Sequence, residues 1–463
     1  MNFSKFLLKD DWHRDTELLG FKSRELIFPK GHIFESDSKG LYNLTWGGWS
    51  EESTNIGGRM QLTEKMMREA QDCANLMFEE IPVEEKIINK KGKPHIYMNV
   101  NTSPVTYSSI VEIGELAAKL EKETGDKYLK LHRGVMDVTT IDLNSFSQNI
   151  DFNQKKIQQY GGNDGDAGLI ETIKDKFHLN DHYVMTVPGG MATLDVVINS
   201  LSDKTFWLPK YHWGSWNKIL SIHGKDIKTF NDFDIRNVEV GEGVVMLCYP
   251  SNPTGYAPKF EDLKAFADVC KEKGQTLILD LPYYYLFNEM SDKIYELYSD
   301  NVIVISSFSK SVGLSGLRVG YIATKNKELY DTMKIRSLYK YNSISTVPQE
   351  IINQLLTSNQ GQTAFDNYRR KTKEHVTKNI QYLSENGLLF NEYTDIPTGP
   401  FAIINKTFVE LLSAKFSSVP LNKFTFKNTE EHLKNVSRIS VSVEHDLFVE
   451  YFDRVLKSSK ELA

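Results

Sequence analysis

The chain has 463 residues, of which 40% are hydrophobic and 25% are charged, so it is long enough for two or three domains with substantial cores. The formal net charge of -6 and the pI near 6.1 indicate no basic surface for nucleic acid or an anionic membrane. No apolar stretch approaches the ~18 residues of a membrane helix, and the N-terminus lacks the features of a signal peptide. The three cysteines are widely spaced, which predicts reduced thiols in a cytoplasmic protein.

Residues 1 to about 125 are expected to form an N-terminal extension that contributes to a smaller lobe. Apolar residues recur at helical spacing over Leu62–Ile81 and over Ile110–Glu123, which predicts two helices. The aromatic-rich segment Leu41–Trp49 is expected to pack on the smaller lobe. The alternatives for this segment are a lid, a dimer arm or a surface for a partner.

From about residue 165 short apolar runs alternate with amphipathic stretches of helical spacing. The runs predict strands at His182–Val187, Thr205–Leu208, Val244–Tyr249, Thr276–Leu281, Val302–Ser306 and Val319–Ala323. Helices are expected between them, for example at Ala192–Leu201 and Lys259–Lys273. Near-continuous apolar strands separated by helices predict an α/β fold, with a mostly parallel sheet covered by helices on both faces. Ligands of such sheets bind beyond the carboxyl ends of the strands.

After about residue 340 the pattern is helical again, at Glu350–Leu356 and Tyr368–Asn386, and a strand-like run follows at Arg438–Val443. We therefore expect three parts along the chain. The extension covers 1–125, a large ligand-binding domain covers 126–335, and a smaller α+β lobe covers 336–463.

Two turns after predicted strands carry groups that suit a phosphate and a polar ring. In Thr186–Thr193 a strand leads into Gly189 and Gly190 and then into a helix, whose exposed N–H groups and dipole attract an anion. In Tyr249–Gly255 the amide of Asn252 can face a polar edge of a ligand. Taken alone, the first is more often only a tight connection and the second more often a proline-directed turn.

Asp280 ends an apolar run and is followed by Pro282 and Tyr283. A carboxylate buried at a strand end needs a partner, because leaving it unpaired is costly. A protonated pyridine nitrogen would be such a partner, and the pairing would keep the ring able to accept electrons. The Tyr283 phenol could then reach the neighbouring ring oxygen. The alternative is that Asp280 caps the next helix.

Lys310 follows a predicted buried strand, between hydroxyl residues and a glycine-rich loop that carries Arg318. Beside a cationic ring and Arg318, the pKa of this lysine would fall well below its usual value of about 10.4. Such a lysine forms imines readily and can carry a proton. Arg318 offers a fixed fork for a phosphate, with Ser307 and Ser309 as further donors.

Arg438 lies in the alternating run Val436–Ser442, far along the C-terminal lobe. An arginine in such a run needs an anion. The α-carboxylate of a substrate, bound bidentately, is one possibility, and a structural salt bridge is the other.

These segments, in this order, resemble the class I and II aminotransferases, the fold type I enzymes that include aspartate aminotransferase and use pyridoxal 5'-phosphate (PLP). The resemblance rests on SxSKxxxxxGxRxG at 307–320, with SNPTG at 251–255 and DxPY at 280–283. It covers about 160–325 and extends weakly to about 445.

The resemblance implies a role for each matching position. Lys310 would carry PLP as a Schiff base and move the proton, Asp280 would pair with the pyridine nitrogen, and Asn252 and Tyr283 would contact the ring hydroxyl oxygen. The phosphate would be held by Arg318, Ser307, Ser309 and the amides of Gly190 and Met191.

Further roles concern the cofactor ring, the substrate and a second subunit. Tyr211 or Trp213 would stack on the ring. Tyr160 matches a tyrosine that reaches the phosphate of the neighbouring subunit, which implies a homodimer. Arg438 would bind the substrate carboxylate, and Gly134 would belong to the substrate-side loop.

Three departures from the family pattern stand out. About 125 residues precede the loop that contains Gly134, and Met191 stands where aspartate-type enzymes carry a small hydroxyl residue. No second substrate-binding arginine can be identified, so a dicarboxylate substrate is not expected.

The expected reaction moves an amino group between an L-amino acid and a 2-oxo acid. The first alternative is another PLP reaction on an amino acid, namely elimination, decarboxylation or oxidation. The second is a regulator that senses PLP and binds DNA through its N-terminal region; residues 1–100 hold more acidic than basic residues, which disfavours it. No metal, nucleic-acid or membrane partner is expected.

Overall fold

The computed structural model describes residues 103–148, 150–290, 292–426 and 430–461, together with six strands in the first hundred residues. The chain divides into two compact units, Met1–Asn101 and Thr102–Ala463. Within the described residues, no helix combines the length and apolar character needed to cross a bilayer. The expected division at residues 125 and 335 stays a prediction.

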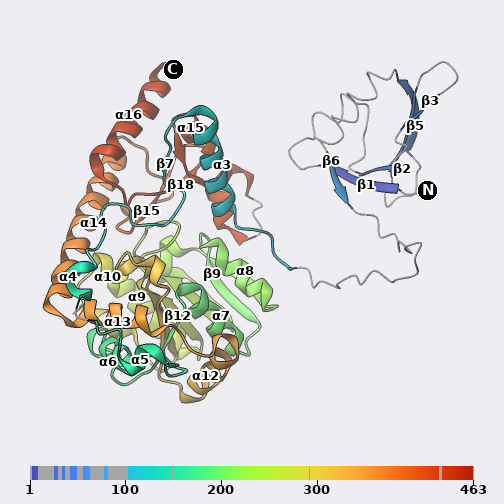
Figure 1. Ribbon diagram of the computed structural model, residues 1–463. Coiled ribbons are helices and arrows are strands. Elements are labelled where there is room, and N and C mark those ends of the chain that lie inside the picture. Colours follow the sequence, from blue (N-terminus) through green and yellow to red (C-terminus); the bar gives the residue numbers. More distant parts are fainter. Residues whose placement is uncertain are drawn as a thin grey trace, which may run out of the picture. The chain divides into compact units, whose positions relative to one another are not determined.

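The first unit contains two three-stranded antiparallel sheets, in the orders β2-β1-β6 and β3-β4-β5 (Figure 1). Its strands are β1 (Phe3–Leu8), β2 (Glu25–Pro29), β3 (Phe34–Ser36), β4 (Tyr42–Gly48), β5 (Ile56–Leu62) and β6 (Phe78–Ile81). The helix predicted over Leu62–Ile81 is wrong at both ends, because Leu62 closes β5 and Phe78–Ile81 pairs with β1. Strand pairing there overrides the local helical spacing, and residues 63–77 lie outside the described residues. The aromatic-rich segment forms β4, the middle strand of its sheet.

A seven-stranded sheet in the order β10-β9-β11-β12-β13-β14-β8 is the centre of the second unit (Figure 1). All of its strands are parallel except β14, which is antiparallel to both neighbours. The strands are β8 (Tyr183–Val187), β9 (Thr205–Pro209), β10 (Asp226–Phe230), β11 (Val244–Cys248), β12 (Thr276–Asp280), β13 (Val302–Ser307) and β14 (Gly320–Thr324). The predicted α/β sheet is confirmed, and six of these strands were expected. The sequence did not indicate β10, because this edge strand is largely exposed and lacks an apolar run.

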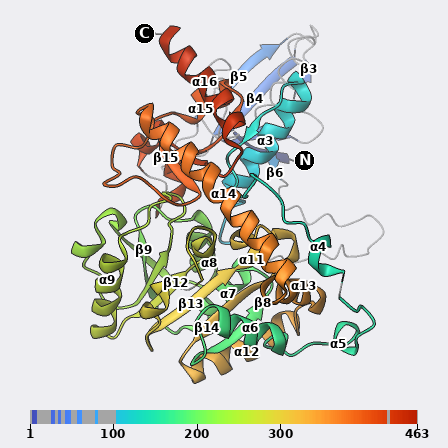
Figure 2. The ribbon, with the colours of Figure 1, turned by 90° about the vertical axis from the view of Figure 1, so that its left-hand side faces the viewer.

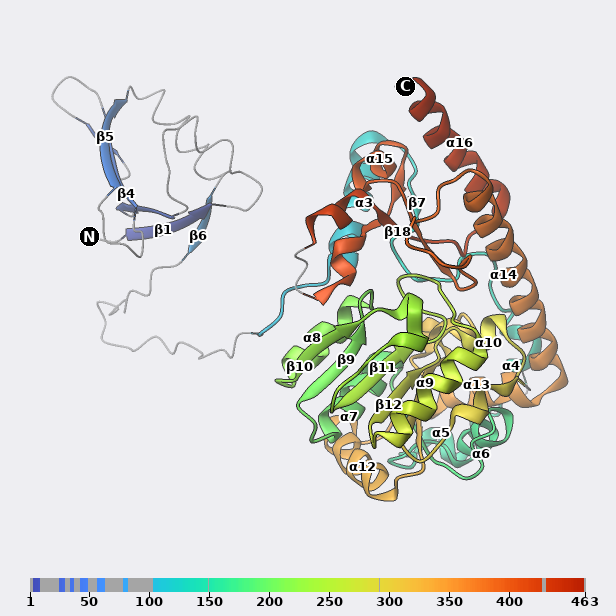
Figure 3. The same cartoon turned by 180° about the vertical axis from the view of Figure 1, so that it is seen from behind.

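The central strands of the sheet are largely apolar because their side chains enter two cores, one on each face of the sheet. In β12, Leu277 and Leu279 enter a core with α6, α9 and α13, whereas Ile278 enters the opposite core with α7, α8 and α12. Figure 3 shows α9 crossing the near face of the sheet. The helices of the large domain are α4 (Asn144–Ser147), α5 (Lys155–Gln158), α6 (Ala167–Lys176), α7 (Gly190–Ser200), α8 (Gly214–Ile222), α9 (Phe260–Glu272), α10 (Tyr284–Phe287), α11 (Phe308–Ser311), α12 (Lys327–Tyr341) and α13 (Thr346–Thr357).

The smaller lobe is joined to the large domain by the long helix α14, which runs from the level of the large sheet into this lobe (Figure 2). The lobe contains the antiparallel sheet β15-β18-β17 and the parallel pair β16-β7. The predicted helices at Ile110–Glu123, Glu350–Leu356 and Tyr368–Asn386 are confirmed as α3, α13 and α14. The elements of the lobe are β7 (Leu129–Lys130), β15 (Phe401–Ile404), β16 (Phe416–Ser417), β17 (Val419–Pro420), β18 (Ser437–Ser440), α3 (Ser109–Thr124), α14 (Asn359–Glu385), α15 (Phe408–Ser413) and α16 (His445–Glu461).

A tight loop after β11 meets the smaller lobe at Gly255. The Gly255 carbonyl accepts hydrogen bonds from the N–H groups of Thr398 and Gly399, at 3.1 and 2.8 Å. Gly255 has a φ of 66°, and a Cβ there would collide with the backbone carbonyl of Phe401 in β15. The contact between the two lobes therefore requires glycine at this position.

Replacing Gly255 by alanine is expected to destabilise the protein more than the same change at Gly274. Both glycines have a φ of 66°, but a Cβ on Gly274 would meet nothing within 4 Å. G274A should lower the free energy of unfolding by about 1–2 kcal/mol, through left-handed backbone strain alone. G255A should cost roughly 1–3 kcal/mol more, because the clash forces the lobes to shift. Denaturant unfolding of the two variants measures the difference, and equal losses would contradict the steric argument.

Candidate active site

The predicted site residues of the large domain gather at the carboxyl edge of its sheet. The parallel strands β8, β11, β12 and β13 all end at this edge. Because β14 is antiparallel, it begins there, and its first residue Gly320 pairs with Val187 at the end of β8 and with Ser307 at the end of β13. Arg318, just before β14, therefore lies beside the turn that follows β8.

Arg318 and the turn after β8 form an anion-binding cradle. The Arg318 guanidinium donates to the Ser309 hydroxyl at 3.2 Å and to the Pro188 carbonyl at 3.4 Å. The Ser307 hydroxyl donates to that of Ser309 at 2.8 Å. A Cβ on Gly189 would overlap the guanidinium, so glycine permits this close approach. Guanidinium, hydroxyls and the N-terminus of α7 together suit a phosphate.

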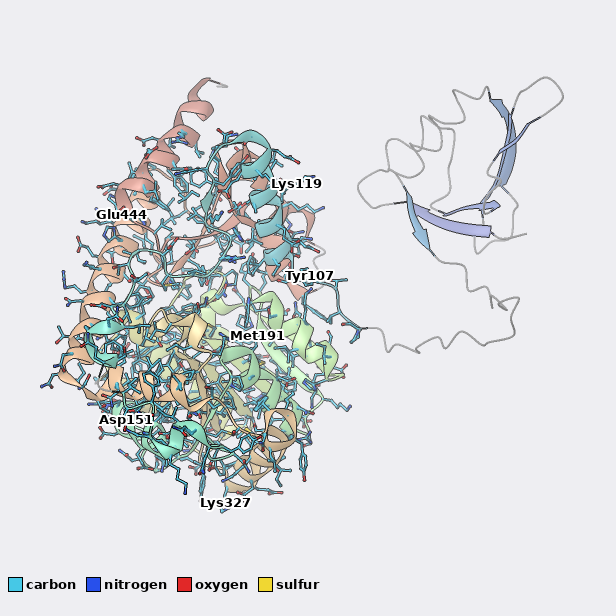
Figure 4. The ribbon with its side chains drawn as sticks, viewed as in Figure 1. Tyr107, Lys119, Asp151, Met191, Lys327 and Glu444 are labelled. Atoms are coloured by element: carbon cyan, nitrogen blue, oxygen red, sulfur yellow. The ribbon has the colours of Figure 1, made fainter. Side chains whose placement is uncertain are left out.

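Gly190 and Met191 begin helix α7 at this cradle. The side chain of Met191 is 44% exposed. In Figure 4 it lies between the large sheet and the smaller lobe, whereas Asp151 and Lys327 lie at the far end of the large domain. Since methionine has no hydroxyl, Met191 can offer a phosphate only its backbone N–H.

Asp280 is buried at the end of β12 without a partner. Within the described residues its carboxyl makes no hydrogen bond, and burial raises its pKa to about 8. The capping alternative is wrong, because the next helix, α10, has Tyr283 at its N-cap and no side-chain cap. A carboxyl in this position gains most from a cationic hydrogen-bond donor such as a protonated pyridine.

Asn252 and Tyr283 meet beside Asp280. The Asn252 side-chain N–H group donates to the Tyr283 hydroxyl at 3.4 Å, and both side chains are buried. The Asn252 Oδ1 atom has no hydrogen-bond partner in the described part of the chain. Burial raises the pKa of Tyr283, with a further contribution from the Cys248 thiol, so its hydroxyl stays a proton donor. The pair can therefore bind a polar oxygen on a ligand ring.

Lys310 lies in the short helix α11 and is half-buried. Burial, together with the positive charges of Arg438, Arg318 and Arg133, lowers its pKa to about 8. A substantial fraction of this amine is therefore uncharged near neutral pH. An uncharged amine is the form that attacks a carbonyl.

Arg438 is buried in β18 on the side of the smaller lobe. Its guanidinium lies between the rings of Phe401 and Phe424, at 4.7 and 4.8 Å from their centres, and donates to the His132 carbonyl at 3.0 Å. Burial lowers its pKa to about 10. Within the described residues its Nε and Nη1 atoms have no partner, and no carboxylate acts on it. The salt-bridge alternative is thus unsupported, and Arg438 is free to bind a carboxylate.

The remaining predicted residues lie in different surroundings. Gly134 is adjacent to Tyr283 and Phe401, since a Cβ built on it would contact both side chains. Tyr160 is 86% exposed, as a residue that reaches another subunit would be. The ring of Tyr211 is fully enclosed, and its hydroxyl donates to a carboxylate oxygen of Glu392 at 2.8 Å, whereas Trp213 is half-buried before α8. Both aromatic residues remain predicted candidates for the ring-stacking position.

Tyr393 links the two halves of the site and was not found from the sequence. Its hydroxyl donates to the Thr254 carbonyl in the loop of Asn252 and accepts from the Ile403 N–H at 2.9 Å. Ile403 pairs with Arg438 across β15 and β18. A lone tyrosine in a loop carries no sequence signal for this role, because its two partners are far apart along the chain.

Solved structures share this architecture. Aspartate aminotransferase from Thermus thermophilus with maleate aligns with a TM-score of 0.66, covering 77% of this chain and 99% of that chain at 18% identity. Substrate-bound BacF from Bacillus subtilis aligns with a TM-score of 0.65, covering 78% and 98% at 17% identity. At these identities the likeness establishes the fold, which is the aspartate aminotransferase-like fold type I.

The family model for aminotransferase class I and II matches residues 128–395, which is more than half of the chain. The chain therefore belongs to this family. It is 26% identical over 235 residues to histidinol-phosphate aminotransferase from Methanocaldococcus jannaschii, covering 50% of this chain and 57% of that protein. It is 23% identical over 272 residues to mitochondrial aspartate aminotransferase from Dictyostelium discoideum, covering 53% and 61%. The chain thus spans less than two thirds of the length of these relatives.

Aminotransferases of this family use PLP, and the residues fit that cofactor. Within the described residues, Asp280 lacks a cationic partner, Asn252 has an unbonded amide oxygen, and the glycine turn lets the Arg318 guanidinium lie close to the N-terminus of α7. These three features match the ring nitrogen, the ring hydroxyl and the phosphate of PLP in turn.

The raised pKa of Asp280 predicts how pH affects the stability of the cofactor-free protein. Between the unfolded value of about 4 and the folded value of about 8, the carboxyl is protonated when folded and ionised when unfolded. The unfolded state then binds fewer protons, so the free energy of unfolding should fall as the pH rises through this range. Denaturant unfolding of D280N, which cannot ionise, should show a weaker fall, whereas D331N on the surface should match the wild type. An unchanged pH dependence in D280N would refute the pKa shift.

Y393F should weaken PLP binding while keeping the ring packing against Phe233 and Phe390. The loss of two hydrogen bonds, each worth about 0.5–1.5 kcal/mol, loosens the loop of Asn252 and should raise the Kd of PLP roughly 5- to 150-fold. The Kd can be titrated through the visible absorbance of the bound cofactor. Y382F, which removes an exposed hydroxyl bonded to Asp453, is the matched control. An unchanged Kd would show that Tyr393 has no positioning role.

Proposed function

We propose that this protein is a PLP-dependent aminotransferase that moves an amino group between an L-amino acid and a 2-oxo acid. The observation that carries the proposal is the combination, at one sheet edge, of a buried carboxyl without a partner and a half-buried lysine of lowered pKa, Asp280 and Lys310. When bound, PLP supplies an aldehyde that condenses with amines and a cationic ring that accepts electrons.

The large domain would hold the cofactor through three groups of residues. Arg318, Ser307 and Ser309, with the backbone N–H groups that open α7, bind the phosphate. Asn252 and Tyr283 bind the ring hydroxyl oxygen. Asp280 keeps the ring nitrogen protonated, because its burial leaves no water to compete for that hydrogen bond.

The substrate would be oriented from the smaller lobe. The buried Arg438 binds the α-carboxylate in a bidentate manner, with Gly134 leaving room beside Tyr283. This fixed carboxylate directs the α-hydrogen toward Lys310. The uncharged lysine amine would accept that proton at its ζ-nitrogen. It would then return the proton to the carbon atom on the other side of the transferred nitrogen.

Other PLP reactions remain the alternative, because the bond at Cα that breaks depends on which one stands perpendicular to the ring. The names of the two relatives compared by sequence support transamination, since both are aminotransferases. Formation of ammonia or carbon dioxide without a 2-oxo acceptor would favour elimination, oxidation or decarboxylation instead.

We further propose that the enzyme works as a homodimer in which Tyr160 contacts the phosphate in the neighbouring subunit. The 86% exposure of its side chain supports this role, because an aromatic side chain gains little from remaining in water. The motif position of Tyr160 is the second support.

K310A is expected to abolish amino transfer, with a loss of about 10²- to 10⁴-fold or more, because the variant loses the amine that forms the Schiff base and carries the proton. Reduction of the wild-type protein with borohydride should fix PLP to the peptide that contains Lys310, and mass spectrometry would detect the adduct. K334A is the matched control, since that lysine pairs with Asp164 away from the site. Full activity or an unchanged adduct in K310A would overturn the proposal.

A further inference from the structure

Within the described part of the chain, aromatic rings and no carboxylate lie against the guanidinium of Arg438. This side chain is 1% exposed, and its guanidinium carbon lies 4.7 Å from the ring centre of Phe401 and 4.8 Å from that of Phe424. The face of an aromatic ring attracts a cation, most strongly where water is excluded. A ring carries no net charge, so it holds the guanidinium in place without neutralising it.

This packing leaves the donors of Arg438 open to a substrate. Its Nη2 atom donates to the His132 carbonyl at 3.0 Å, whereas the buried Nε and Nη1 atoms have no partner among the described residues. Bidentate binding of a carboxylate requires two parallel hydrogen bonds, and therefore a guanidinium whose plane is fixed. The two rings restrain that plane, because a guanidinium that tilted would lose contact with both.

Phe424 is tied to the large domain, although it belongs to the smaller lobe. It ends the short 3₁₀ helix Leu421–Phe424, and its carbonyl accepts a hydrogen bond from the His212 N–H at 2.9 Å. The carbonyl of the next residue, Thr425, accepts one from the side-chain amide of Asn217 at 3.3 Å. The Oδ1 atom of Asn217 lies 2.7 Å from Nε2 of the buried His212 ring. Both contacts of the Phe424 segment thus lead to one stretch of the large domain.

That stretch carries both candidates for the ring-stacking position, since Tyr211 and Trp213 flank His212 in the sequence. Phe424 therefore touches Arg438 with its side chain and the stacking segment with its backbone. It connects the group expected to bind the substrate carboxylate with the group expected to cover the cofactor ring.

We propose that Phe424 is a positioning residue, which fixes the Arg438 guanidinium at a set place relative to the cofactor ring. The inference rests on the proposed function and adds a residue outside the motifs at 251–255, 280–283 and 307–320. Without the ring of Phe424 the guanidinium can tilt, so that a carboxylate gains one hydrogen bond in place of two. The loss affects every ligand with an α-carboxylate to a similar extent, because this contact does not involve the side chain of the substrate.

F424M tests the proposal in the holoenzyme, since methionine fills a similar volume without an aromatic face. KM for L-amino acid donors should rise roughly 5- to 30-fold, the range for one buried cation–π contact. The turnover number kcat should change much less, because the carboxylate is bound in both the substrate and the transition state. The Kd of primary amines without a carboxylate, read from the absorbance of the bound cofactor, should stay unchanged.

F416M is the matched control, because Phe416 is equally buried in the same lobe but packs on Tyr451 and Phe452. It should lose stability to a similar extent and keep the KM of the wild type. N217A approaches the contact from the large domain and removes the hydrogen bond to Thr425. It should raise KM about 2- to 13-fold, and it removes no core ring, so it tests the proposal even where F424M fails to fold.

An assay that needs no amino transfer separates failure of this inference from failure of the proposed function. Phenylglyoxal modifies arginine, and mass spectrometry can follow the peptide that contains Arg438. Propionate should protect Arg438 in the wild type, and F424M should need roughly 5- to 30-fold more propionate for the same protection. If this holds while no amino donor reacts, Phe424 keeps its positioning role and the aminotransferase proposal fails. The role is overturned if donors react but KM and protection in F424M match those in F416M, or if N217A leaves KM unchanged.

Discussion

Burial of ionisable groups without oppositely charged protein partners is the constraint on which the rest of the site depends. The same physical cause, loss of water, raises the pKa of Asp280 and lowers those of Lys310 and Arg438. In the protein alone each group costs stability, since nothing nearby compensates its charge. A ligand with a cationic ring nitrogen, a carbonyl and a carboxylate relieves all three costs at once. The site is therefore organised before its ligands arrive, and the energy spent on that organisation is recovered on binding.

The fold supplies this arrangement through one reversed strand and one interlobe junction. Because β14 runs against its neighbours, the loop of Arg318 reaches the edge where β8 and β13 end. On the other side, Gly255 lets the loop of Asn252 touch β15, whose partner strand β18 carries Arg438. Cofactor groups thus belong to the large sheet and substrate groups to the smaller lobe. Hydrogen bonds through Tyr393 tie these two sets together.

The sequence predicted the parts of this molecule that rest on local signals. Strands buried on both faces appear in the sequence as apolar runs, so the sequence predicted β12 and β13. It did not predict the exposed edge strand β10. The helix expected at Leu62–Ile81 is replaced by a strand at its C-terminal end. This strand pairs with β1, and local helical spacing carries no information about a contact with such a distant segment. Lys310 and Asp280 could be named because their motif is compact. Tyr393 could not, since its importance depends on which remote segments it meets in the folded chain.

The separation of roles between the lobes has a consequence for selectivity. In the proposed function, Asp280 and the phosphate cradle hold the cofactor ring on the large sheet. Arg438, which lies between Phe401 and Phe424 in the smaller lobe, would orient the substrate on that ring. On this proposal, a shift of β15 against the loop of Asn252 would turn the substrate relative to the ring and change which bond at Cα stands perpendicular to it. The hydrogen bonds of Tyr393 between the lobes would then influence the choice of reaction together with Lys310.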